Sequence, residues 1–130
     1  MDDMIREEKV LGVGSFGEVF LAHLKNNPNR KFAIKKIISL NIASLLNEIQ
    51  IMAKADNYFV IRMYNCEIYE ESIHIIIEYC SGSDLGHLLT DAKVFDEQRA
   101  RFYIACILQG LDYLHKQNII HRLVLKLVKA

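Results

Sequence analysis

The sequence has few residues that build covalent or metal crosslinks. Its three cysteines, Cys66, Cys80 and Cys106, are odd in number, widely spaced and without a Cys-x-x-Cys pair. This usage argues against a disulfide framework and favours free thiols in a reducing compartment. The five histidines show no metal-ligand spacing, so the sequence predicts no metal held by protein ligands alone. Pro28 is the only proline, and no Pro- or Ser-rich linker divides the chain.

The sequence also lacks an excess of either charge and a long apolar run. Lys and Arg number 16, as do Asp and Glu, so no nucleic-acid partner is predicted, because such binders usually carry a basic excess. The densest apolar run, residues 73–77, is too short to cross a bilayer, and the acidic N-terminus is not a signal peptide. No membrane partner is therefore expected, and the location is predicted to be cytoplasmic, with a nuclear one equally compatible.

What the chain does have is apolar residues, a hydrophobic fraction of 52%, arranged as a strand-like first half and a helical second half. A turn is expected at residues 26–29, and a capping residue, Asp96, before the last helix. Together the elements predict an α+β fold. Strands are expected at residues 10–13, 18–24, 31–38, 62–69 and 72–79, and helices at 42–53, 85–89 and 96–116.

A glycine-rich segment separates the first two strand-like runs. Gly12, Gly14 and Gly17 form a Gly-x-Gly-x-x-Gly pattern, and glycines let backbone N–H groups approach anionic oxygens closely. Dinucleotide-binding folds use this spacing, but there the glycines open a helix. Here Gly17 leads into a strand-like run, and no Gly-Lys-Ser/Thr follows. We expect a hairpin that covers phosphates, with an ordinary tight hairpin as the alternative.

Lys35 ends the third strand-like run. Because side chains alternate along a strand, Ala33 and Lys35 share one face, and Lys36 is expected to point the other way, into solvent. The small Ala33 leaves room for a flat ring, beyond which Lys35 would reach phosphates. Glu48 shares a helical face with Met52 and is the candidate counter-ion for Lys35, with a solvated Glu48 as the alternative.

These segments together resemble the eukaryotic protein kinases, whose signature combines a Gly-rich loop, a lysine on the third strand and a His-Arg-Asp catalytic loop. Residues 75–85 resemble the last N-lobe strand, the hinge and the next helix, and residues 118–122 resemble the run into the catalytic loop. The resemblance implies an α+β kinase-like N-lobe, a five-stranded antiparallel sheet with one αC-type helix. Its implied domains are the N-lobe at 5–79, the hinge at 80–83, the first part of the C-lobe at 84–122 and an unmatched tail at 123–130.

The resemblance also implies an ATP site with Lys35 and Glu48 in catalytic roles. Ile77 would stand at the gatekeeper position behind the adenine, and Asp84 would lie near the ribose. Ile77 as plain core and Asp84 as a plain helix cap are the alternatives. The implied nucleotide contacts are Leu11, Gly12, Gly14, Ser15, Phe16, Gly17, Val19, Ala33, Lys35, Ile77, the backbone of Glu78 and Cys80, and Asp84.

The family pattern ends abruptly after Arg122. Leu123 stands where the family has the aspartate that positions the substrate hydroxyl, and the asparagine and Asp-Phe-Gly segment that hold Mg²⁺ are missing from the sequence. Mg²⁺ is thus expected for the intact family, but its ligands are absent here. Such abruptness favours a shifted reading frame, a read-through intron or a truncated gene model over the gradual decay of an inactive kinase.

Three functions compete at this point. The first is a protein kinase that transfers the γ-phosphate of ATP to protein Ser/Thr hydroxyls. Ser/Thr is favoured because the sequences of residues 81–85 and 95–115 are more similar to those of Ser/Thr kinases. The second is a non-catalytic nucleotide- or partner-binding pseudokinase-like module, and the third a truncated product without function. The apolar face of the predicted helix 96–116 is expected to be exposed, where it would bind a partner or aggregate.

Overall fold

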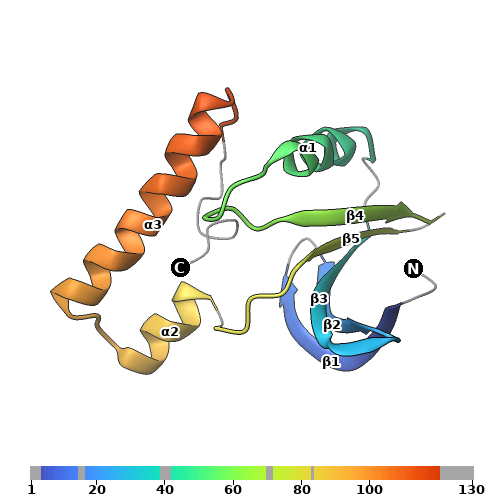
Figure 1. Ribbon diagram of the computed structural model, residues 1–130, viewed down its shortest axis with the longest axis horizontal. Coiled ribbons are helices and arrows are strands. Elements are labelled where there is room, and N and C mark those ends of the chain that lie inside the picture. Colours follow the sequence, from blue (N-terminus) through green and yellow to red (C-terminus); the bar gives the residue numbers. More distant parts are fainter. Residues whose placement is uncertain (1–3, 15–16, 39–41, 70–71, 83, 121–130) are drawn as a thin grey trace. The chain divides into compact units, whose positions relative to one another are not determined.

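The computed structural model describes residues 4–14, 17–38, 42–69, 72–82 and 84–120. The chain forms two compact units. The first comprises Met1–Lys54 and Arg62–Tyr79, and the second Ala55–Ile61 and Cys80–Ala130. All described strands belong to the first unit, together with one helix, and the other described helices belong to the second (Figure 1).

The first unit is built on a five-stranded antiparallel sheet within the described residues, with strand order β1-β2-β3-β5-β4. One helix, α1, follows β3 in the chain (Figure 1). The predicted sheet and helix are therefore confirmed. The elements are β1 (Met4–Gly14), β2 (Gly17–Leu24), β3 (Asn27–Ile37), α1 (Ile42–Lys54), β4 (Met63–Ile68) and β5 (Ile73–Glu78).

The turn between β2 and β3 is tighter than predicted. Leu24 pairs directly with Asn27, so the turn consists of Lys25 and Asn26, and β3 begins at Asn27 rather than near residue 31. Pro28 therefore lies inside the strand. It sits where the β2–β3 register shifts, and such an irregularity tolerates a residue that has no backbone N–H to donate.

Both faces of the sheet bury apolar side chains, which follows from the alternation of side chains along each strand. On one face, Ala22, Phe32, Ile34 and Ile76 form a cluster with Leu24 packed against it. The other face is covered by α1. There the buried residues are Ile37 and Ile49 from β3 and α1, and Ile73 and Ile75 from β5.

The described part of the second unit contains two capped helices, α2 (Leu85–Ala92) and α3 (Glu97–Lys116). The predicted cap of α3 is confirmed, because Asp96 Oδ1 accepts a hydrogen bond of 2.8 Å from the Arg99 N–H. At the other end of α3, Asn118 takes a left-handed φ of 57°. The Asn118 N–H donates to the His115 carbonyl and the Ile119 N–H to the Leu114 carbonyl, which completes a Schellman motif.

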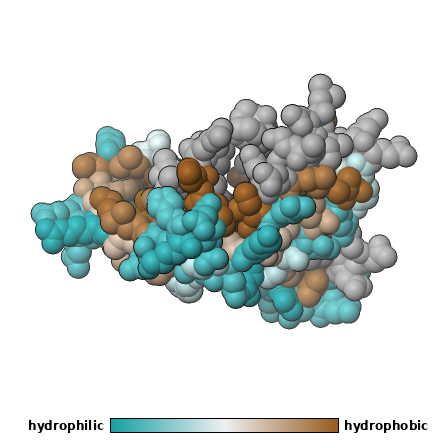
Figure 2. Space-filling view, turned by 90° about the horizontal axis from the view of Figure 1, so that it is seen from above, coloured by the Kyte–Doolittle hydropathy of each residue, from teal (hydrophilic) through white to brown (hydrophobic). Residues whose placement is uncertain are grey.

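The core of the second unit is small. Leu114 of α3 packs with Ala55 and Val60, and the Asp56 N–H donates to the Tyr113 hydroxyl at 2.9 Å. The apolar face predicted for this helix is only partly covered, because Ile104 and Leu108 are 55% and 59% exposed. Figure 2 shows hydrophobic side chains at the surface where α3 lies, at the left of the view. None of the described helices is long and apolar enough to cross a membrane.

Candidate functional site

The glycine-rich segment forms the end of the β1–β2 hairpin, as predicted. Gly12 pairs with Val19 and Gly14 with Gly17, so the pattern joins two strands and does not open a helix. This geometry separates the segment from the dinucleotide-binding fingerprint. The predicted phosphate contacts Ser15 and Phe16, between the two strands, lie outside the described residues.

Gly17 is required by the packing of the protein itself. Its φ of +126° lies in the region that side chains disfavour, and a β-carbon there would collide with the carbonyl oxygen of Lys36. The same β-carbon would stand 3.2 Å from the Cα of Ile37. The missing side chain thus allows β2 to start close against β3.

Gly12 shows the opposite situation. A β-carbon at this position would have no protein atom within 4 Å, and its φ is not among the positive values that occur in the described part of the chain. Neither backbone conformation nor packing therefore explains a glycine here. The open space beside its backbone is what a group approaching from outside needs, and it fits an anionic ligand at the hairpin.

The register of the sheet places the predicted ring and phosphate contacts on one face. Val19 pairs with Lys35 and Ala33 with Ile77, and directly opposed residues project to the same side. Ala33 is 5% exposed, whereas Val19, Lys35 and Ile77 are half-buried. Leu11, also half-buried, lies beside the register shift between Val10 and Gly12. The face is the one that α1 covers, since Ile77 packs against the cluster that contains Ile49.

Glu48 lies in α1, directly before the buried Ile49. Its side chain is outside the part that the structure describes. The ion pair between Lys35 and Glu48 consequently stays a prediction.

Lys36 faces away from Lys35, as predicted, but it is half-buried and not solvent-exposed. Its ladder partners explain this, because Glu18 of β2 and His74 of β5 flank it on either side. The prediction of an exposed lysine was wrong because β3 is an inner strand, with neighbours on both edges.

The end of β5 is fixed by hydrogen bonds to the chain before β4. The Glu78 N–H donates to the Arg62 carbonyl at 2.9 Å, and the Arg62 N–H donates to Glu78 Oε2 at 3.3 Å. Any adenine contact at Glu78 would have to use its carbonyl oxygen, because its N–H is committed. Cys80, two residues later, is exposed.

Asp84 caps α2, which is the plainer of its two predicted roles. Its carboxylate accepts the His87 N–H, and this bond is the main reason that the pKa of Asp84 lies below its usual value. The Gly86 backbone N–H and the His87 ring also bond this carboxylate, and neither residue was singled out from the sequence. The signal for His87 was available, because the residue three positions after a helix cap places its N–H beside the capping side chain.

Two further observations limit the chemistry of the described residues. Burial, and secondarily the negative charge of Glu67, raise the pKa of the Cys66 thiol, so this cysteine is a poor nucleophile. No set of three His, Cys, Asp or Glu side chains among the described residues is arranged to hold a metal ion.

Comparisons with known proteins agree with this geometry. The family model "Protein kinase domain" matches residues 5–124. A fruit fly cGMP-dependent protein kinase, isozyme 2 forms cD5/T2, is 32% identical over 124 residues, which are 91% of this chain and 13% of that protein. A probable cAMP-dependent protein kinase catalytic subunit from Encephalitozoon cuniculi is 37% identical, over 88% of this chain and 38% of that protein.

A third relative, the probable serine/threonine protein kinase IRE of Arabidopsis thaliana, is 38% identical over 88% of this chain and 10% of that protein. The chain thus spans between 10% and 38% of the length of these three relatives. The match covers the hairpin, the β3 lysine, α1 and both helices of the second unit. The chain therefore belongs to the protein kinase domain family, and the sheet and helices described above are a kinase-like N-lobe and the start of a C-lobe.

Proposed function

We propose that this chain is the ATP-binding part of a protein kinase that transfers the γ-phosphate to protein Ser/Thr hydroxyls. The observation that carries the proposal is the pair of glycines at the β1–β2 hairpin. Gly17 is needed by the fold, whereas Gly12 has open space beside its backbone, which leaves room for an external group to approach. Lys35 lies on the same sheet face as Ala33 and Val19, and one of the relatives is a probable serine/threonine protein kinase by name.

In this proposal, the hairpin binds the phosphates, and Lys35 neutralises their charge with Glu48 as its counter-ion. Ala33 and Ile77 contact the adenine, which bonds the Glu78 carbonyl and the Cys80 backbone, and Asp84 contacts the ribose. Protein kinases use ATP with Mg²⁺, and phosphoryl transfer depends on positioning and charge neutralisation. The remaining nucleotide contacts are Leu11, Gly12, Gly14, Ser15, Phe16, Gly17 and Val19.

We also propose that these 130 residues by themselves bind nucleotide without transferring phosphate. The reason is Leu123, which replaces the aspartate expected after His121-Arg122 and lies outside the described residues. Within these 130 residues the sequence also has no Asp-Phe-Gly segment, whose aspartate would help to hold Mg²⁺. We propose a cytoplasmic location, with the nucleus as the alternative.

Replacing Lys35 by Met tests the ATP proposal, with Lys36→Met as the matched control. The two lysines are neighbours on opposite faces of β3 and are both half-buried. Loss of a charged hydrogen bond to phosphate should weaken ATP binding roughly ten- to hundredfold in Lys35→Met. Calorimetric titration of the 130-residue chain, with circular dichroism to verify folding, measures the difference. Equal affinities of two folded variants, or no ATP binding by the unmodified chain, would refute the proposal.

The alternative of a partner-binding module is favoured by one observation, the exposure of Phe102, Ile104 and Leu108 on α3. We propose that this face associates with a partner or with other copies of the chain. The double change Ile104→Glu and Leu108→Glu should then reduce self-association in sedimentation velocity without loss of helicity. Gln109→Glu, which adds charge at another exposed position of α3, is the control. A chain that stays monomeric and soluble at high concentration would argue against self-association.

A further inference from the structure

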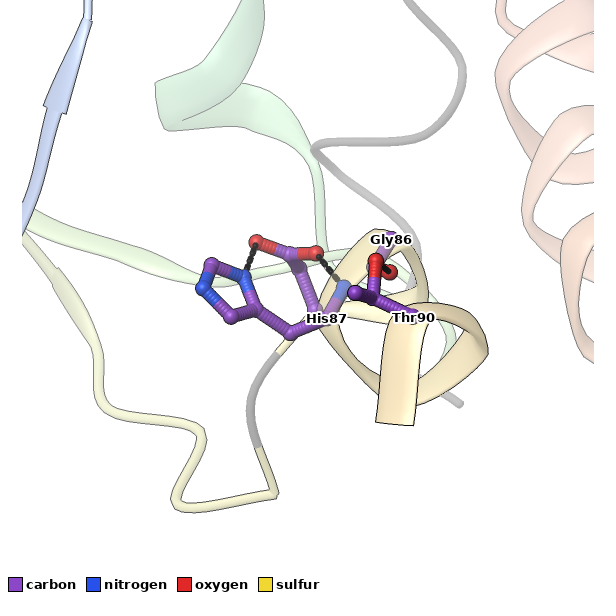
Figure 3. A network of polar contacts seen from close by, with 4 residues as sticks. Gly86, His87 and Thr90 are labelled. Atoms are coloured by element: carbon purple, nitrogen blue, oxygen red, sulfur yellow. Dashed lines mark hydrogen bonds and ion pairs between the residues drawn. The ribbon is translucent and has the colours of Figure 1, made fainter. Parts of the chain in front are cut away.

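The carboxylate of Asp84 is held by two groups of one residue, His87. The Asp84 Oδ1 atom accepts the His87 backbone N–H at 2.9 Å, and Oδ2 lies 3.2 Å from Nδ1 of the His87 ring (Figure 3). An ionised carboxylate can only accept hydrogen bonds, so Nδ1 must carry the proton and donate. Both carboxylate oxygens are therefore fixed at the start of α2.

Gly86 provides the space for this arrangement. A β-carbon at position 86 would come within 3.0 Å of Asp84 Oδ1, which is closer than ordinary van der Waals contact. Thr90, one turn later, instead bonds the Gly86 carbonyl through its hydroxyl at 2.8 Å (Figure 3). The carboxylate position thus depends chiefly on His87. An alanine at position 86 would require Oδ1 to shift by only a few tenths of an ångström, and Thr90 serves the helix backbone alone.

The fixed carboxylate keeps acceptor capacity on its outer side. Each oxygen has two lone-pair sites, and His87 uses one on each oxygen. The side chain of Asp84 is 66% exposed, so a ligand can approach it. The pKa of Asp84 is lowered, chiefly by the His87 N–H, and the group is ionised at neutral pH, as a carboxyl with an ordinary pKa already is. Two fixed, charged acceptors side by side match two neighbouring hydroxyl donors, as on a ribose.

We propose that His87 is a positioning residue that holds Asp84 ready to accept hydrogen bonds from the ribose hydroxyls of the nucleotide. The inference rests on the proposed function, because it needs nucleotide to bind to the chain. A helix cap alone would need only the His87 backbone N–H. The ring contact fixes the second oxygen, Oδ2, as well, which the cap does not require.

The test compares ATP with 2′,3′-dideoxyATP, which lacks both ribose hydroxyls, by calorimetric titration of the 130-residue chain. His87→Ala removes the ring and keeps the backbone N–H that caps α2. It should weaken ATP binding roughly two- to tenfold, because one hydrogen bond no longer orients the carboxylate. Binding of 2′,3′-dideoxyATP should stay unchanged. His115→Ala, at the exposed end of α3, is the control and should change neither affinity.

His87→Asn supplies the rescue, since the asparagine Nδ2 takes about the place of Nδ1 and can donate to Oδ2. It should restore most of the preference for ATP that His87→Ala loses. If ATP binds but His87→Ala affects both nucleotides equally or neither, the inference is wrong and the proposed function stands. If the unmodified chain binds neither nucleotide, the proposed function fails and the inference fails with it.

Discussion

The two units of the chain bury their apolar residues to different extents. In the sheet, residues from three strands are almost fully covered, with Ala22 at 0% and Ile34 and Ile75 at 2% exposure. In the helical unit, α2 has no buried residue, and Phe102 of α3 is 59% exposed. Among the described residues, the strands thus bury most of their apolar side chains against other residues of the first unit, whereas the helices of the second unit bury few of theirs.

The physical origin of this contrast is the number of apolar surfaces that each element offers. A strand inside a sheet projects its side chains to both faces of the sheet. In β5 both faces bury apolar residues, because Ile75 belongs to the cluster on one face and Ile76 to the cluster on the other. A helix buries a single stripe. In α3 the buried stripe narrows to Cys106, Gly110 and Leu114. Ile107 and Leu111 beside it are half-buried, whereas Phe102, Ile104 and Leu108 remain exposed.

The largest effect is expected from Gly17→Ala, which would break the better-packed unit. The new β-carbon would combine a disfavoured φ of +126° with a collision at the Lys36 carbonyl. Such strain costs about 1–3 kcal/mol before the steric term is added, so we expect a loss of at least about 3 kcal/mol in the free energy of unfolding. Urea denaturation followed by circular dichroism measures this loss.

Gly12→Ala is the matched control, because its β-carbon enters open space. We expect a change of stability within about 0.5 kcal/mol, as at other unconstrained surface positions. If Gly17→Ala were as stable as Gly12→Ala, the close approach of β2 and β3 at this point would be disproved.

The second prediction compares the two cores directly. Ile34→Ala removes a residue enclosed by the sheet cluster, and Leu114→Ala removes the main apolar residue of the second unit. Substitutions of this kind cost about 2–5 kcal/mol, with the lower values where the surroundings can relax. We expect the loss in free energy of unfolding to be near the lower limit of this range for Leu114→Ala and larger for Ile34→Ala.

Hydrogen exchange of backbone amides separates the two effects by region. Ile34→Ala should reduce protection in β2, β3 and β5, whereas Leu114→Ala should reduce it chiefly in α3. A uniform loss of protection across both units in Leu114→Ala would show that they unfold together, which contradicts the comparison.

Much of the fold could be predicted because its signals are local. The alternation at Ile73, His74 and Ile75 indicated a two-faced strand, and Asp96 indicated the start of α3. The tight turn at Lys25 and Asn26 was missed, because the asparagines and Pro28 after it carry the stronger turn signal. Position in the sheet, which a single strand does not reveal, decided the burial of Lys36.

The candidate site was predictable as a motif but not in its physical detail. The sequence pattern assigned Gly12 and Gly17 the same role. The structure distinguishes them, because β3 lies close to Gly17 and leaves no room for a side chain there, whereas Gly12 has open space beside it. Likewise, Asp84 was identified from its place after the hinge. The bond of its second oxygen to His87 depends on a side-chain orientation that spacing alone does not determine.

The smallest effect concerns the pH dependence of the less buried unit. The pKa of Asp84 is lowered in the folded chain, mainly by the His87 N–H. Its contribution to stability is therefore complete above the unfolded pKa of about 3.9 and is lost as pH falls through the folded value. We expect the protection of the α2 amides, measured by hydrogen exchange, to decrease below about pH 4. Because Asp84 is 66% exposed, the loss should be smaller than that from deleting a helix cap. Asp84→Asn keeps a capping side chain that does not titrate, so its α2 protection should vary less over this range, and an identical pH profile would show that the carboxylate has no such role.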